Sequence, residues 1–336
     1  MFEVEKLTEV FIQPLPERNA AFRPAEVNLM RFIPIPDGCE ERNENLTVPE
    51  GISIPIRPLE SITPSRRVVA IDGASVTLGH IDGGVVGAVR ATVVVREAGG
   101  RIKAERYGPY LIVATARNSQ MIYDRLRKTV IGSPANVRAP HYTRMTDRVR
   151  GFLEKFLQLE AARSYTDSLI LLDGSMRVGT FDTPKGFMKR VLRHAASKGS
   201  DVAAVSKRTG LTVESTGRSI LSVLDGVDGA CYANVKPYIT QGHARYFGNI
   251  YVCKLSRTGR VFRVDIPEGT PTGHAVILSE LSGLAGDSGY PEVLRMAHVL
   301  SAFTQVEVLE LQAAAVRIYG MELRENIRRE LFGPFG

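Results

Sequence analysis

Two short apolar runs, each followed by an aspartate and a glycine, form the clearest pattern in the chain. Residues 68–71 precede Asp72-Gly73, and residues 169–172 precede Asp173-Gly174. Short apolar runs rich in branched side chains are typical of buried strands. Asp-Gly is also a common turn signal, so a turn explains a single copy equally well. Two copies, both directly after buried strands, favour a pair of carboxylates that binds a metal ion.

The first run leads into a predicted β-meander. Residues 85–96 and 101–115 are rich in strand-forming side chains, and Gly99-Gly100 marks the turn between them. A short helix over residues 117–130 and a proline-containing loop follow.

Residues 147–163 have the periodicity of a helix. Their apolar positions recur at spacings of three and four: Val149, Phe152, Leu153, Phe156 and Leu157. Thr146 is the expected N-cap. The helix leads into the strand that ends at Asp173, and such a crossover places this strand parallel to the first one. Meander, helix and parallel strand are the connectivity of the ribonuclease H-like fold, so we predict an α/β protein whose mixed sheet is flanked by helices.

The remaining segments extend this core. The predicted elements are a basic helix over 184–198, a strand over 201–206, a helix or loop over 211–224, strands over 247–256 and 260–266, and helices over 291–303 and 305–330. Residues 1–66 are rich in proline, which disfavours long helices and central strands. We therefore predict an extended arm, 1–66, that wraps the core or contacts a partner, and one ribonuclease H-like domain, 67–336.

The composition indicates the cellular environment of the protein and the class of partner that it binds. The formal net charge of +7 and the pI of about 9.4 favour an anionic partner, with nucleic acid first. Cys39, Cys231 and Cys253 have no metal-ligand spacing and are expected to be reduced core thiols of a cytoplasmic protein. The N-terminus does not resemble a signal peptide, and no uninterrupted apolar run reaches the roughly 18 residues that span a bilayer. These features predict a soluble protein without a membrane segment.

The two aspartates need further ligands if they bind catalytic metal ions. Two-metal phosphodiester cleavage uses several converging carboxylates, and such oxygen ligands suit magnesium or manganese. Glu160 lies nearer the centre of the apolar stripe of helix 147–163, whereas Glu154 lies on its flank. The axial rise favours Glu154, because the tip of the strand lies about 20 Å from its start. Glu154 lies roughly 13 Å from the end of the helix and Glu160 only about 5 Å. We predict Glu154 as the third ligand and retain Glu160 as the alternative.

Basic residues near the predicted strands are candidates for binding the scissile phosphate. Lys207 follows the strand at 201–206 and is placed like a phosphate ligand, although most lysines are simply solvated. His298 lies on a largely apolar helix, where a histidine is more often a core residue than a ligand. His80 and Asp82 are weaker candidates, because a turn before Gly83 explains them.

Four stretches, taken in order, resemble the NurA family of archaeal repair nucleases. They are Val69–Ser75, Leu169–Met176, Ala204–Arg208, and Gly289–Pro291 with Ala297-His298. Residues 262–267 also resemble a late strand of this family, and the likeness extends over roughly residues 65–305. Ala74 and the pair Glu292-Val293 depart from the usual pattern and affect packing more than chemistry.

The resemblance implies a manganese-dependent nuclease with a ribonuclease H-like core. Its expected activities are 5′→3′ exonuclease and single-strand endonuclease cleavage of DNA, acting on single- and double-stranded ends. A homodimer that docks on a hexameric HerA-type translocase during end resection is also implied. By analogy, Asp72, Glu154 and Asp173 are metal ligands. Tyr290 completes the site with His298, which is a metal or phosphate ligand.

Two other classes of function are compatible with the same residues. Actin-like ATPases and sugar kinases share the topology, but they add a second copy of the domain with a glycine-rich phosphate turn, which Gly226 and Gly229 do not form convincingly. A non-catalytic DNA-binding adaptor of a motor would explain the positive charge. It would not explain a set of three carboxylates.

Overall fold

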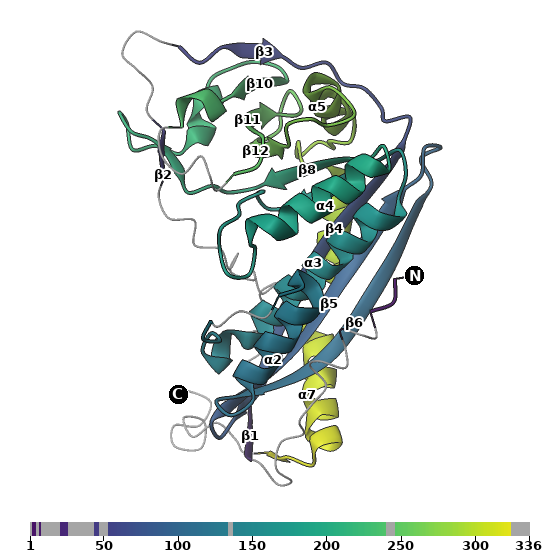
Figure 1. Ribbon diagram of the computed structural model, residues 1–336, viewed down its shortest axis with the longest axis vertical. Coiled ribbons are helices and arrows are strands. Elements are labelled where there is room, and N and C mark those ends of the chain that lie inside the picture. Colours follow the sequence, from purple (N-terminus) through teal and green to yellow (C-terminus); the bar gives the residue numbers. More distant parts are fainter. Residues whose placement is uncertain are drawn as a thin grey trace.

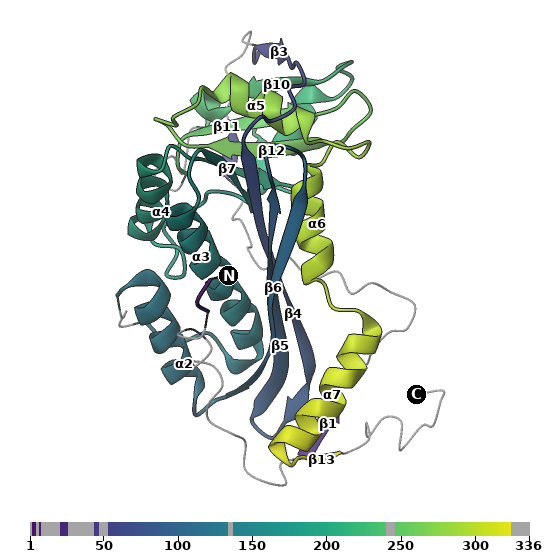
Figure 2. The same cartoon turned by 90° about the vertical axis from the view of Figure 1, so that its right-hand side faces the viewer.

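A long mixed sheet with helices on both faces forms the centre of the molecule (Figures 1 and 2). This is a computed structural model, and it describes residues 2–4, 7, 21–25, 44–46, 53–133, 137–239 and 246–323. The arrangement confirms the predicted α/β class with a mixed sheet flanked by helices.

Three long antiparallel strands form the predicted meander: β4 (Arg67–Ile81), β5 (Gly84–Arg96) and β6 (Ile102–Thr115). The expectation that the first strand ends at Asp72 is wrong, since β4 continues for nine further residues to Ile81. It continues because β5 pairs with it over almost its whole length. Asp72-Gly73 therefore lies within a strand and not in a turn.

A helical crossover connects the meander to the next strand. Its elements are α2 (Ser119–Leu126), a π-helical turn (Arg127–Ile131), a 3-10 turn (Tyr142–Arg144), α3 (Met145–Ser164) and β7 (Ser168–Asp173). β7 pairs with β4 in parallel, as predicted. Thr146 is not the N-cap, because α3 already begins at Met145 and the buried Thr146 side chain packs where Gly87 of β5 leaves space.

The sheet then grows on the far side of β7. Its further elements are α4 (Lys185–Ser197), β8 (Asp201–Ser206), β10 (Cys231–Asn234), β11 (Asn249–Lys254) and β12 (Val261–Ile266). β8 is parallel to β7, and β12, β11 and β10 follow as antiparallel neighbours. The segment 211–224 contains strand β9 (Leu211–Val213) and a 3-10 helix (Ile220–Leu224). Another 3-10 turn (Lys236–Tyr238) follows β10.

Three short strands from the N-terminal 66 residues are described, two of them in this sheet and one in a separate two-stranded sheet. β1 (Ala21–Pro24) pairs with the end of β4, β2 (Glu44–Leu46) pairs with β9, and β3 (Ile56–Pro58) forms the edge beyond β10. Prolines in β1 and β3 agree with positions near the ends of a sheet. Cys39 lies outside the described residues, whereas Cys231 and Cys253 are buried free thiols, as expected.

The C-terminal part contains one helix that was not predicted and two helices that are shorter than predicted. α5 (His274–Gly283) was not predicted, because its hydrophobic residues lack a clear stripe. α6 (Glu292–Ser301) and α7 (Gln305–Tyr319) replace the predicted 291–303 and 305–330. α7 stops at Tyr319 because Gly320 turns the chain out of the helix, and β13 (Glu322–Leu323) then pairs with β1.

One described stretch, Glu292–Tyr319, has the length and composition of a membrane-crossing helix. The sequence-based expectation overlooked it because charged residues interrupt its apolar positions. Residues 302–304 divide the stretch into α6 and α7, with 10 and 15 residues. Each is shorter than the roughly 20 residues that a spanning helix needs.

A hydrophobic layer covers each of the two faces of the sheet. Val69 and Ile71 pack toward α3 and α4, whereas Val68 and Ala70 pack toward α5 and α6, as the period of two requires. Figure 2 shows α3 and α4 on one side of the strands and α6 on the other.

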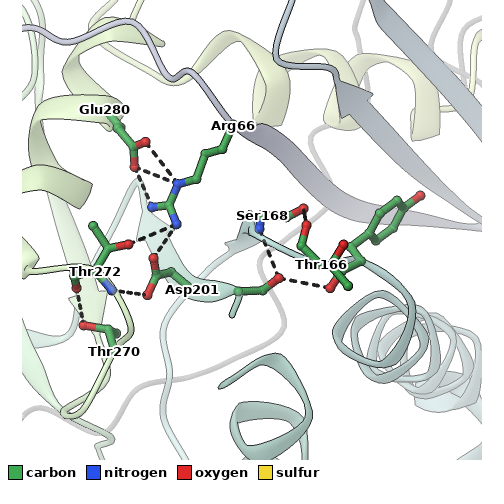
Figure 3. A network of polar contacts seen from close by, with 9 residues as sticks. Arg66, Thr166, Ser168, Asp201, Thr270, Thr272 and Glu280 are labelled. Atoms are coloured by element: carbon green, nitrogen blue, oxygen red, sulfur yellow. Dashed lines mark hydrogen bonds and ion pairs between the residues drawn. The ribbon is translucent and has the colours of Figure 1, made fainter. Parts of the chain in front are cut away.

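A buried polar network joins the beginning of β4 to neighbouring elements (Figure 3). Arg66 forms ion pairs with Asp201 of β8 and with Glu280 of α5, the latter at 2.6 Å. Asp201 also accepts a hydrogen bond from the Thr272 backbone N–H at 3.1 Å. This network fixes α5 against the strands that carry the site described next.

Candidate active site

Asp72 and Asp173 occupy adjacent positions on two parallel strands. Ile71 pairs with Leu172 at the last paired position of β4 and β7, so the next residue on each strand is one of the two aspartates. One ligand atom from each carboxylate and one ring nitrogen of His298 lie within 4.8 Å of one another. The structure thus brings together three residues that are far apart in the sequence.

Glycine is required after each of the two aspartates, but for a different structural reason at each position. Gly174 adopts φ = 107°, which ends β7 directly after Asp173. Gly73 has ordinary strand geometry, but a Cβ atom there would lie 2.6 Å from Glu154 Oε1. Gly73 is therefore required for close approach of the Glu154 carboxylate, next to Asp72. Gly174 thus ends its strand in a bend, whereas Asp72-Gly73 lies within β4, so the turn explanation fails for the first pair.

Of the two candidate glutamates, the structure places Glu154 beside the aspartates. Glu154 is 17% exposed and accepts a hydrogen bond from Arg150 at 2.6 Å. Glu160 lies further along α3 and forms an ion pair with Arg163 at 2.8 Å. The axial argument thus selected the glutamate that lies next to Gly73, and its role as a metal ligand stays a prediction.

Burial and mutual repulsion disfavour the ionised form of the carboxylates. Burial is the largest cause that raises the pKa of Glu154, and Asp72 and Asp173 raise it further, whereas Arg150 lowers it. Burial and Asp72 likewise raise the pKa of Asp173, and Lys207 opposes this. Negative charge is therefore concentrated here at an energetic cost, which a bound cation would relieve.

His298 faces the cluster and is not a core residue. Its side chain is 50% exposed, and its Nδ1 lies 2.7 Å from Asp72 Oδ2. This hydrogen bond raises the pKa of His298, although burial opposes the rise. Because a carboxylate only accepts hydrogen bonds, Nδ1 carries a proton. Nε2 is then available to a metal ion when the ring is neutral, and donates to a phosphate when the ring is protonated. Ser301, one turn further along α6, donates to the Asp72 backbone oxygen at 2.9 Å.

Lys207 and Tyr290 form the second flank of the site. Lys207 Nζ donates to Asp173 Oδ2 at 2.8 Å and lies 5.0 Å from the centroid of the Tyr290 ring. Tyr290 is 6% exposed and packs on Phe262 of β12. Tyr290 therefore supports Lys207 through its ring face, while the ammonium group faces the aspartates.

His80 and Asp82 do not belong to this site. His80 is eight residues beyond Asp72 on β4, which corresponds to about 26 Å along an extended strand. Asp82 lies in the turn between β4 and β5, as the turn explanation predicted.

Sequence reasoning missed several polar residues around the cluster. Arg150 resembles an ordinary helix-surface partner of Glu154, and Asp147, which accepts a hydrogen bond from Ser75 at 2.7 Å, resembles an ordinary first-turn acid. The only signal in the sequence was spacing: Asp147 precedes Arg150 by three residues and Arg150 precedes Glu154 by four, which places all three on one face of the helix.

A buried ion pair on β12 also escaped the sequence analysis. Arg263 donates to both oxygens of Asp265, at 2.7 and 2.8 Å, and the two side chains are 0% and 1% exposed. Asp265 also accepts a hydrogen bond from the Met176 backbone N–H at 2.9 Å, and Arg263 donates to Thr209 Oγ1 at 3.2 Å. The pair therefore connects the loops that follow Asp173 and Lys207.

Comparison with known proteins agrees with this arrangement. The family model of the NurA domain matches residues 66–303, which include both aspartates, Glu154, Lys207 and His298. This chain belongs to the NurA family. NurA-family membership makes it a nuclease, a hydrolase that depends on a divalent metal ion. A search among curated proteins found no match.

Several solved structures are similar to this chain. The NurA nuclease from Sulfolobus solfataricus matches with 17% identity and a TM-score of 0.50, over 77% of this chain and 87% of that one. A second NurA structure has 10% identity and a TM-score of 0.45, over 77% and 90% of the two chains. The catalytic domain of human Endonuclease V has 12% identity and a TM-score of 0.39, over 83% and 92%. The first of these similarities supports the ribonuclease H-like fold of the NurA domain.

Proposed function

We propose that this NurA-family chain cleaves DNA with 5′→3′ exonuclease and single-strand endonuclease activity during end resection at double-strand breaks. The observation that carries the proposal is the cluster of Asp72, Asp173 and His298 where β7 ends beside β4. The Glu154 carboxylate approaches Gly73 on the same strand. An adaptor without catalytic activity has no use for acids held together against their mutual repulsion.

The chemistry of this donor set fits a divalent cation. Carboxylate oxygens with one imidazole are ligands for manganese or magnesium. The pKa values of Glu154 and Asp173 are raised, which means that the ionised carboxylates are unfavourable until a positive charge binds beside them. We propose Asp72, Glu154, Asp173 and His298 as ligands of manganese, with magnesium as the alternative, in a two-metal site. Bound ions would supply an activated water and stabilise the leaving oxygen.

The remaining side chains would act on the DNA strand. The Lys207 ammonium is placed to attract the scissile phosphate, and Tyr290 restricts its position through the ring face. Asp72 orients the His298 ring through Nδ1, and Ser301 fixes the Asp72 backbone. The positive net charge of the chain favours the approach of DNA.

The wild-type protein is expected to cut DNA only when a divalent ion is present. Purified protein should degrade 5′-labelled single-stranded and double-stranded substrates with manganese, and a chelator should stop the reaction. Adding back manganese should restore cleavage. Nucleotide binding by calorimetry without DNA, together with no cleavage under these conditions, would contradict the nuclease and support the ATPase alternative.

We further propose that the chain works in the cytoplasm as a homodimer with a hexameric HerA-type ATPase. The partner follows from the family resemblance. The dimer has support in the described surface, because Val306, Leu309 and Ala313 form an exposed apolar stripe on α7. Val306 is 65% and Leu309 49% exposed, and such a stripe at helical spacing is typical of an interface.

The change Leu309→Glu is expected to dissociate the dimer. Burying an unpaired charge at the centre of an apolar interface costs on the order of several kcal/mol per ion. Size-exclusion chromatography with light scattering should show the mass fall from twice 36.9 kDa to 36.9 kDa. Ile318→Glu is the matched control, since Ile318 is 57% exposed on the opposite side of α7 and should leave the dimer intact. A wild-type monomer, or a dimeric Leu309→Glu variant, would contradict this interface.

A further inference from the structure

Arg150 is a cation enclosed by the acidic side chains of the site. It lies on α3 one turn before Glu154, and one of its terminal nitrogens donates to Glu154 Oε1 at 2.6 Å. Attraction by Glu154 raises the pKa of Arg150, burial opposes this, and Asp72 and Asp147 add to the rise. The guanidinium therefore sits in the field of at least three carboxylates.

This ion pair differs from the other arginine–glutamate pair on the same helix. Arg163, which pairs with Glu160, is 44% exposed, whereas Arg150 is 19% exposed. The Nε atom of Arg150 is buried and has no hydrogen-bond partner among the described residues. A buried donor without a partner is costly, so attraction by the acidic cluster holds the guanidinium in place more than its own hydrogen bonding does.

Arg150 holds the oxygen of Glu154 that faces the site. Oε1, the atom that accepts its hydrogen bond, is also the atom that would lie 2.6 Å from a Cβ at Gly73, next to Asp72. A metal ion on this oxygen and a guanidinium on the same oxygen repel each other. Binding of the ion to this oxygen therefore weakens the attraction between Glu154 and Arg150 and favours release of the guanidinium.

The position of Arg150 also indicates which second group its guanidinium can bind. Among the described residues, β4 pairs with β7 up to Ile71 and with β1 from Gly79, and between these two points no strand pairs with this side of β4. Glu154 contacts Gly73 and Asp147 binds Ser75 along that stretch, so Arg150 lies between two contacts with the unpaired part of β4. A planar guanidinium with several donors is suited to a phosphate group.

We propose that Arg150 is a resident counter-ion that the metal ion displaces and that then binds a phosphate of the DNA strand. This inference rests on the proposed nuclease function. In the metal-free protein Arg150 neutralises part of the acidic cluster. Once the ion has taken over this charge, the guanidinium is released toward the substrate.

The test is to replace Arg150 with methionine, which keeps much of the volume and removes the charge. Manganese binding without DNA, measured from the electron paramagnetic resonance signal of free manganese, should become tighter by roughly tenfold, because the competing charge is gone. DNA cleavage at saturating manganese should fall by roughly a hundredfold, because a phosphate contact is lost. Arg163→Met on the same helix is the matched control and should change neither quantity.

The two measurements separate the possible failures. Manganese affinity that is unchanged or weaker in Arg150→Met would overturn the counter-ion role, and undiminished cleavage would overturn the phosphate role. Asp173→Asn in the same binding assay tests the proposed function itself, which fails if this variant binds manganese normally. Should Arg150→Met not fold, Arg150→Lys retains the charge without the planar donor set. It should bind manganese as the wild type does and cleave more slowly.

Discussion

Asp173→Asn is expected to abolish DNA cleavage, with a loss of at least about a thousandfold, while the protein remains folded. Changing groups that only support a metal ligand typically costs roughly 10–100-fold in affinity or activity, so loss of a ligand oxygen should cost more. Asparagine has the same shape as aspartate but lacks the charge that a divalent cation needs. The same outcome is expected for Asp72→Asn and, if Glu154 is the third ligand, for Glu154→Gln.

The stability of Asp173→Asn should not fall, and this follows from the sign of the pKa shift. Burial and Asp72 raise the pKa of Asp173 above its ordinary value of 3.8, so the metal-free folded state binds its proton more tightly than the unfolded state. This contribution to stability is lost as the pH rises through the raised pKa of Asp173 in the folded protein. Asparagine does not ionise, so the metal-free variant should melt at pH 7 at the same temperature as the wild type or higher.

Added metal should distinguish a ligand from a structural residue. Manganese should raise the melting temperature of the wild-type protein, because a ligand that binds only the folded state stabilises it, and should not raise that of Asp173→Asn. Glu160→Gln is the matched control, since Glu160 lies on the same helix as Glu154 but pairs with Arg163. Normal cleavage by the double variant Asp72→Asn, Asp173→Asn would refute the site.

The parts of the site that could be predicted are those fixed by backbone geometry. Parallel strands place Asp72 beside Asp173, and the rise of an antiparallel helix selects Glu154 over Glu160. Both inferences need only the order and length of elements. The role of Gly73 was not accessible in this way, because it depends on how closely α3 approaches β4.

What the sequence did not reveal depends on side-chain contacts across elements. Thr146 has the identity of an N-cap, yet Gly87 on β5 provides a space that draws it into the packed face of α3. Arg150 and Glu154 have the spacing of a solvated pair, but they are more buried than Arg163 and Glu160, which the sequence does not show. Local patterns thus identify elements, whereas tertiary packing decides what each polar residue does.

The ion pair on β12 is the second place where a single change should have a large effect. Asp265→Ala would leave the fully buried Arg263 guanidinium without its bidentate partner. Removing one member of a buried ion pair costs about 3–5 kcal/mol. We expect the free energy of unfolding, measured by urea denaturation, to fall by about this amount. Cleavage should also decrease at temperatures where the variant is folded, because Asp265 no longer holds the Met176 N–H in the loop that follows Asp173.

An exposed pair of the same two residue types provides the control. Arg218 and Asp225 are 63% and 55% exposed in their side chains, and exposed pairs contribute about 0–1 kcal/mol, so Asp225→Ala should leave stability and cleavage nearly unchanged. Replacing both buried partners, as Arg263→Met with Asp265→Leu, should restore much of the stability, because no unpaired charge remains. The double variant should nevertheless cleave DNA more slowly than the wild type, because neither apolar replacement could hold the loops after Asp173 and Lys207. A stable double variant with full activity would show that the pair contributes only to folding.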